Sequence, residues 1–328
     1  MKTKFKVYKL HFTTPLHIGD ERDDYSISLK TYQSDAMYAA LTSCLAKVGR
    51  EIPTNGDLGF SISSLYPFYQ KDEKSNVAYF FPKLIKQKLP ENIELNKKIK
   101  KVEWVDTSFF EKMINGELQM GDNIVDYIEG NFMSKPKIEE NFISSQVAQR
   151  VTVSRNFSKD AEPFYMDRVY FKDNSGLFFI AEGNTNLLEK ALNILKYEGI
   201  GTDRNIGNGF FKVSPDEIEI NLPKSEYATN LSMFCPESEV QLNEMLDDKH
   251  TSYDFTKRGG WITDAPHNTI RKNTIHMFMP ASIFKMNNVQ SKVNVIGKIV
   301  DLNPRKTYPG IDHSIWRNGK SIFIPIKI

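Results

Sequence analysis

A glycine-rich segment at positions 199–209 holds the residue types best suited to bind a phosphate-containing ligand. It reads Gly-Ile-Gly-Thr-Asp-Arg-Asn-Ile-Gly-Asn-Gly. Glycine adopts positive φ and lets a backbone come close to a ligand, so its N–H groups can cradle phosphate oxygens. An arginine adds a charge-assisted fork and asparagine adds a neutral hydrogen bond. The candidate contacts are therefore Gly199, Gly201, Thr202, Arg204, Asn205, Gly207, Asn208 and Gly209.

The position of this loop decides which phosphates it can hold. Dinucleotide-binding and Walker-type loops follow a strand and open a helix, whereas this loop follows a helical pattern and precedes an apolar run. The loop itself contains no Gly-Lys-Ser/Thr triplet. These features argue against a nucleotide-hydrolysing enzyme. The alternative is a tight glycine connection that binds nothing, since one glycine is enough to end a helix.

Two residues after the first predicted strand are further candidates. His17 and Gly19 should lie at the sheet end where the glycine loop emerges and could hydrogen-bond a nucleotide. The alternative for His17 is a structural role, which is commoner for a lone histidine. Asp35 could be mistaken for a catalytic acid. Its position next to the predicted helix cap Ser34 is explained by the favourable interaction of an acidic side chain with the helix dipole. We assign no catalytic residue and expect no metal or cofactor.

Charge is distributed unevenly along the chain. Residues 249–328 contain 13 Lys and Arg against 4 acids, and residues 214–248 contain 1 Lys against 9 acids. A basic C-terminal third suggests a polyanionic partner, because cations that neutralise phosphates release counterions. The alternative is that the acidic and basic segments lie against each other. The candidate contacts with a polyanion are Arg150, Arg155, Arg271 and Arg305. The alternative for the first two is a solvent-facing salt bridge, and for the last two it is an acidic surface of a partner protein.

The elements that must position these residues follow from hydrophobic periodicity. Positions 5–12 predict a strand whose alternation slips near Tyr8, as a bulge or a strand buried on both faces would. Ser34 predicts a helix start, and Gly49 its end. Residues 164–171 and 177–181 predict a hairpin, and Asn186 with Glu189 predicts a capping box for a helix that ends at Gly199. A strand from position 210 completes the order βαββαβ, which is the ferredoxin-like (RRM-like) arrangement.

The length of 328 residues indicates two domains. We predict an α+β protein with two ferredoxin-like units. The first spans residues 1–215 and carries an insertion at about 50–150, which we interpret as strand completion plus a projection. The second, divergent and basic, spans residues 216–328. No apolar run has the ~18 residues of a membrane span, and the two cysteines lack metal-site spacing, so a cytoplasmic protein is expected.

Three stretches resemble the RAMP superfamily of CRISPR proteins. They are the strand and loop at 10–19, the helix opening at 34–41 and the glycine loop through position 210. Two others, Arg-Val-Thr-Val-Ser-Arg at 150–155 and the ending at 310–325, are similar to subunit four of type III-A Csm effector complexes. The resemblance is spread over the whole chain.

This resemblance implies a non-catalytic subunit that binds CRISPR RNA and caps its 5′ handle. It implies two protein partners, a large polymerase-like subunit and the RAMP backbone subunit, and only an indirect relation to target RNA. It also implies an inserted β-hairpin thumb that displaces a nucleotide at the guide boundary, which we place within residues 50–150. His313, Trp316 and Arg317 are expected to fix the C-terminal strand.

A related class remains as the alternative, the endoribonucleases that process CRISPR repeats without metal. Such enzymes need a histidine to move a proton during attack by a 2′-hydroxyl, and His17 is the candidate. Their glycine loop lies close to the C-terminus, whereas here more than 100 residues follow Gly209. A generic RRM is less favoured, because the aromatic RNP-type strand is missing.

Overall fold

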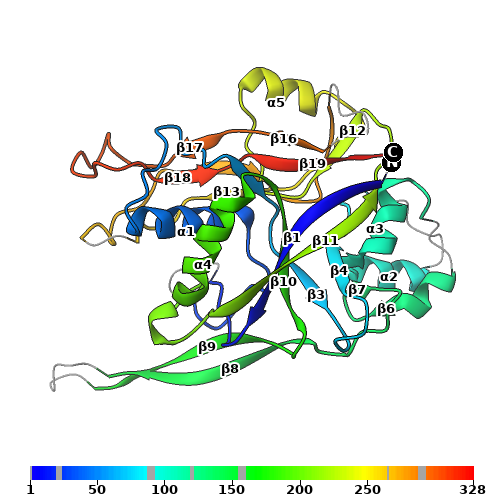
Figure 1. Cartoon of the computed structure of the whole chain (residues 1–328), viewed down its shortest axis with the longest axis horizontal. Helices are drawn as coiled ribbons and strands as arrows, with labels where there is room; N and C mark the ends of the chain where they lie inside the picture. Colours follow the sequence, from blue (N-terminus) through cyan, green and yellow to red (C-terminus); the bar gives the residue numbers. More distant parts are fainter. Residues whose placement is uncertain are drawn as a thin grey trace.

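The first predicted strand pairs on both sides within a large antiparallel sheet. The computed structural model describes residues 2–19, 24–86, 93–118, 122–153, 160–263, 266–286 and 293–328, which form a mixed α+β structure (Figure 1). Within these ranges, one sheet has nine strands. Eight of them follow the order β11 (Phe211–Asn221), β1 (Lys2–Phe12), β10 (Ser175–Gly183), β3 (Tyr66–Tyr69), β4 (Ala78–Pro82), β5 (Trp104–Asp106), β7 (Phe132–Met133) and β6 (Ile128–Glu129). The ninth, β2 (Phe60–Ile62), also pairs with β10.

Strand β1 is buried on both faces. Phe5 and Val7 belong to one hydrophobic cluster, while Tyr8 and Leu10 belong to another. Successive side chains of a strand point to opposite faces, so odd and even positions enter separate cores. The irregular alternation in the sequence therefore reflects two-sided burial and not a bulge.

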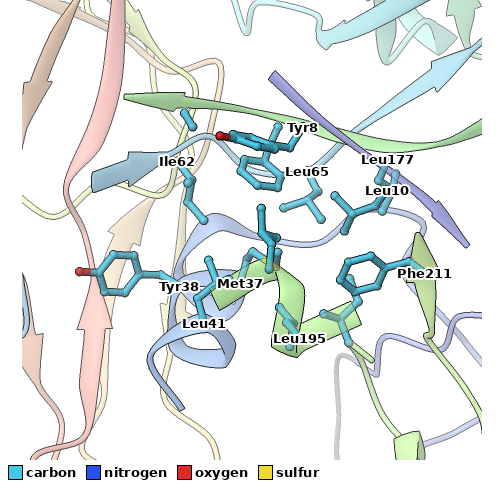
Figure 2. Packing of buried hydrophobic residues seen from close by; sticks show 14 of the residues in the cluster. Tyr8, Leu10, Met37, Tyr38, Leu41, Ile62, Leu65, Leu177, Leu195 and Phe211 are labelled. Carbon is cyan, nitrogen blue, oxygen red and sulfur yellow. The ribbon is translucent and has the colours of Figure 1, made fainter. Parts of the chain in front are cut away.

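Two helices cover one face of this sheet, and both were predicted. Figure 2 shows Met37 of α1 (Ser34–Lys47) and Leu195 of α4 (Thr185–Glu198) gathered with Leu10 of β1. The expected caps are wrong by one or two positions. Helix α1 is preceded by Gln33, and the cap of α4 is Asn184, whose side chain accepts from the Leu187 N–H.

The opposite face packs against α3 (Thr107–Ile114) and a second sheet. Ile322 and Ile324 of that sheet share a hydrophobic cluster with Phe5 and Ile180 of the first. Its strand order is β15 (Ile283–Lys285), β12 (Tyr227–Asn230), β19 (Ser321–Ile326) and β16 (Asn294–Ile296). The other described elements are α2 (Ile93–Lys101), η1 (Asp122–Tyr127), α5 (Glu239–Leu246), β13 (Phe255–Arg258), β14 (Ile275–Phe278), β17 (Ile299–Asp301) and β18 (Trp316–Asn318). Within the described ranges, no helix is long and apolar enough to cross a membrane.

The predicted hairpin between 164–171 and 177–181 is wrong in its pairing. Strand β9 (Glu162–Phe171) pairs along its whole length with β8 (Ile143–Thr152), and the two form an arm that projects from the body (Figure 1). Strand β10 pairs instead with β1 on one edge and with β2 and β3 on the other, and β2 and β3 come from the stretch interpreted as insertion. That stretch therefore supplies strand completion, as predicted, while the long projection begins at Ile143.

Strand β11 crosses the domain boundary that was predicted after residue 215. It pairs with β1 from Phe12↔Phe211 to Lys2↔Asn221 and so stays in the first sheet. Lys9 Nζ lies 2.9 Å from Asp216 Oδ2, and Lys4 Nζ lies 3.8 Å from Glu217 Oε2. The start of the acidic segment thus faces the lysines of β1, whereas its end meets the basic C-terminal third, with Lys285 Nζ 3.7 Å from Asp248 Oδ2.

Candidate nucleic-acid interface

The glycine loop needs glycine for its backbone shape. Helix α4 ends at Gly199 with φ 74°, and Gly201, Gly207 and Gly209 have φ of 85°, 93° and 76°. Between them lies a short 3-10 helix, η2 (Arg204–Ile206). This region of φ is disfavoured for residues with a Cβ, so all four positions fit glycine for a local reason.

Close packing adds a second constraint. A Cβ on Gly201 would lie 2.3 Å from the His17 carbonyl oxygen, and one on Gly209 would lie 1.9 Å from the Ile200 carbonyl oxygen. The loop is tied to the segment after β1, because Thr202 N–H donates to His17 O at 2.8 Å. The absence of a side chain at these glycines therefore allows the loop to pack closely against the end of the sheet.

The expectation that the glycine N–H groups face phosphate is wrong for three of the four. Gly199 donates to Leu195 O at 2.8 Å, Gly207 to Arg204 O at 3.1 Å and Gly209 to Pro15 O at 2.8 Å. A donor used within the chain is not free for a ligand. The side chains of the loop, and not these amides, carry any remaining binding function.

Arg204 is the cation that this loop presents. Its side chain is 40% exposed, and Nη1 lies 4.0 Å from Glu198 Oε2. Glu198 is held more closely by Lys47 of α1, with Nζ to Oε2 at 2.6 Å. Asn205 is exposed beside Arg204, whereas Asn208 is buried with its Nδ2 lacking an acceptor within the described chain. Arg204 and Asn205 are thus the accessible polar groups, and Thr202 is half-buried.

His17 is placed beneath this loop and not on its surface. Its side chain is fully buried, and Nδ1 lies 2.7 Å from Asp167 O. The ring stacks on Tyr25 at 5.8 Å between centroids. This conformation offers the ring to neither RNA nor a water, so the expected direct contact is wrong and the residue is structural. Gly19 is exposed two residues further along.

The other candidate arginines lie apart from the loop in sequence and differ in what holds them. Arg150 lies on β8, with Nη1 3.8 Å from Met166 Sδ. Arg271 is exposed and lies over the Trp261 ring at 4.8 Å. Arg305 is paired with Asp301, with Nη2 to Oδ2 at 3.1 Å. Arg155 lies outside the described residues.

A cleft of about 820 Å³ brings Arg204 together with three other cations that were not predicted to lie beside it. Helix α1 contributes Lys47, and the C-terminal part of the chain contributes Lys272 and Arg317. These residues are too far apart in sequence for any spacing signal. The basic composition of residues 249–328 was the signal for a polyanion near Lys272, whereas Arg317 was expected to fix the C-terminal strand.

Asp35 is explained by an ion pair and not by the expected cap. Its Oδ2 lies 2.8 Å from Arg258 Nε and 2.8 Å from Arg317 Nη1, and its side chain is fully buried. Burial alone would raise the pKa of this carboxyl, but the two guanidiniums overcome it and hold the pKa below 3.8. The role assigned to Ser34 also changes, because its Oγ accepts from the Met233 N–H at 2.9 Å.

Known proteins are similar to this chain over nearly its whole length. The family model described as the CRISPR Csm4 C-terminal domain matches residues 223–326. A CRISPR-system Csm4 protein from Streptococcus thermophilus is 25% identical over 337 residues, covering 98% of this chain and 99% of the relative. A Csm4 protein from Methanocaldococcus jannaschii is 22% identical, covering 99% and 98%.

Solved structures share the fold. One is a Csm3–Csm4 subcomplex of the type III-A CRISPR-Cas interference complex, with TM-score 0.60 and 17% identity over 99% of this chain and 100% of the other. Another is a Csm1–Csm4 cassette with pppApA, with TM-score 0.57, 17% identity and 99% coverage of both. The chain is therefore similar to Csm4 proteins over 98% of its length, and it shares its fold with the Csm4-containing solved structures.

Proposed function

We propose that this chain is a non-catalytic subunit of a type III-A Csm effector complex, which caps the 5′ handle of CRISPR RNA. The observation that best supports this proposal is the similarity to a Csm4 protein over 98% of the chain. Arg204 supports the RNA contact, since it is an exposed cation at a basic cleft. Phosphate contacts of this kind position a nucleic acid without reading its bases.

The partners follow from the relatives. Csm4 occurs with Csm1 in one solved structure and with Csm3 in another. We therefore propose that this chain joins the large polymerase-like subunit to the RAMP backbone subunit, and that target RNA contacts it only indirectly. The projecting β8–β9 arm is the candidate for the thumb, because Val147, Val151 and Tyr165 expose apolar surface there. This location differs from the predicted one within residues 50–150, since β9 lies wholly beyond that stretch.

We also propose that the first sheet and its two helices form a ferredoxin-like unit. The order β11-β1-β10-β2/β3, with α1 and α4 as crossovers, is that of a ferredoxin-like unit. The unit would end between β11 and β12, near residues 222–226. The second unit would be divergent, since one helix of eight residues, α5, is described between its first and last strands.

The repeat-processing nuclease is not favoured by any feature of the site. His17, on which that alternative depends, has its ring buried and its Nδ1 hydrogen-bonded to a carbonyl. A general base must reach the proton that it abstracts. Incubation of the purified protein with repeat RNA in the absence of metal tests this alternative, and cleavage lost in His17→Ala would establish it.

The RNA-binding role is tested with Arg204→Ala. We expect weaker binding of handle-bearing RNA and a log–log salt slope smaller by about 0.7–0.9, because one phosphate contact is lost. The thermal midpoint should be unchanged, since among the described residues the ion pair of this side chain is the long 4.0 Å contact with Glu198. Lys190→Ala, an exposed position on α4, is the control. Unchanged affinity together with an unchanged slope would remove Arg204 from the interface.

A further inference from the structure

The cleft beside Arg204 is lined by cations from three separate parts of the chain. Lys47 comes from α1, Arg204 from the glycine loop, and Lys272 and Arg317 from the C-terminal part. No carboxylate lines it among the described residues. Its volume of about 820 Å³ lies within the range of pockets for small organic ligands.

Lys272 is the least compensated of these cations. Among the described residues, no group accepts a hydrogen bond from its ammonium and no carboxylate lies within ion-pair distance. Burial, with a smaller effect from the Arg317 charge, lowers the pKa of this lysine to about 8, while Asp35 acts in the opposite direction. A half-buried ammonium of this kind is costly unless a counter-charge arrives.

Arg317 next to it is also incompletely satisfied. Nη1 bonds Asp35 and Nη2 bonds Gly259 O at 3.0 Å, but Nε has no acceptor within the described chain, and the residue is only 8% exposed. The single carboxylate of Asp35 already serves Arg258. Arg258 and Arg317 therefore share the carboxylate of Asp35, which among the described residues lies beyond ion-pair distance of Lys272.

The remaining lining complements a nucleotide. Ile52, Pro53 and Trp316 give an apolar wall, and hydroxyls of Thr42, Thr54 and Ser314 give neutral hydrogen-bonding groups. A base or ribose can pack against the former while a phosphate meets the cations. The cleft is larger than a phosphate ion alone requires.

We propose that this cleft binds a nucleotide, with its phosphate against Lys272 and near Arg317 and Arg204. The backbone of the glycine loop is not part of this site. If the nucleotide is a residue of bound RNA, the proposal rests on the proposed RNA-binding function. That source is either a residue of bound RNA or a free nucleotide, because both present the same phosphate chemistry. Since α1 and the C-terminal part both line the cleft, bound ligand also stabilises their packing.

The test measures binding of UMP, uridine and inorganic phosphate to the full chain by titration calorimetry, with thermal unfolding in parallel. The native protein should bind UMP more tightly than either fragment and should melt higher in its presence. Lys272→Gln should weaken UMP binding about 10- to 100-fold, as expected for a lost charge-assisted hydrogen bond. Lys272→Arg should recover most of the affinity, and Lys190→Gln is the matched control.

A parallel arm follows binding of a single-stranded oligoribonucleotide by fluorescence anisotropy. Loss of RNA affinity in Lys272→Gln, with UMP as competitor, identifies RNA as the source, whereas loss of UMP binding alone identifies a free nucleotide. Both results support the site. If Lys272→Gln folds and binds UMP and RNA as the native protein does, the site is overturned. In that case RNA binding sensitive to Arg204→Ala would still support the proposed function.

Discussion

Asp35 of α1 and Arg317 of β18 form a buried ion pair, with Oδ2 and Nη1 2.8 Å apart although the residues are 282 positions apart in sequence. Arg258 binds the same carboxylate from β13. The contact fixes the first helix against the C-terminal part of the chain. Arg317 of this ion pair also lines the cleft beside Arg204.

Neutralising this carboxylate should destabilise the protein strongly. Asp35→Asn leaves Arg258 and Arg317 buried without a counter-charge, and breaking such a pair costs about 3–5 kcal/mol. Urea unfolding measures the loss. Glu217→Gln is the control, because its Lys4 partner is 3.8 Å away and its side chain is 66% exposed, so it should change the free energy of unfolding by less than about 1 kcal/mol. Equal effects of the two substitutions would contradict a buried pair.

The same carboxyl predicts how stability depends on acid. Its folded pKa lies below the ordinary value of 3.8, so the unfolded chain takes up the proton first as pH falls. The stabilisation is complete above 3.8 and is lost as pH falls through the lower folded value. The stability difference between the native protein and Asp35→Asn should therefore be constant near neutrality and should shrink below pH 3.8. A constant difference down to strongly acidic pH would argue against this assignment.

Lys272 predicts the opposite behaviour at alkaline pH. Its folded pKa of about 8 lies below the ordinary 10.5, so between these values the unfolded chain binds more protons and stability rises with pH. Lys272→Gln should be more stable than the native protein at pH 7, because it removes an uncompensated charge. This advantage should disappear as pH passes from about 8 to 10.5. Denaturant unfolding across that range measures it, and an advantage independent of pH would mean that packing, not charge, is responsible.

The glycines of the loop should respond unequally to alanine. Gly207 has open space around its Cβ position, so Gly207→Ala bears only the cost of positive φ, about 1–2 kcal/mol. Gly209→Ala adds a Cβ placed 1.9 Å from Ile200 O, where the neighbour is backbone and must shift. Thermal unfolding should rank Gly209→Ala as clearly the more damaging. The reverse order would mean that the loop can rearrange at Gly209.

Properties that depend on neighbouring residues in the chain were predictable from the sequence. The apolar stripes of α1 and α4 predicted both helices, since helical periodicity is local. The glycines at 199, 201, 207 and 209 all have the positive φ that their residue type favours. The family resemblance, carried by short motifs, was confirmed by the comparisons.

Properties that depend on which distant segments meet were decided by the tertiary structure. Strand β10 could pair with β9 across a short turn, but both of its edges are occupied, one by β1 and the other by β2 and β3, while β9 pairs with β8. Burial of His17, the Asp35–Arg317 pair and the cation-lined cleft likewise arise only when segments far apart pack together. Charge and hydrogen-bonding partners at such contacts leave no periodic pattern, so sequence alone determined the elements and the glycine loop, while packing decided what each polar residue does.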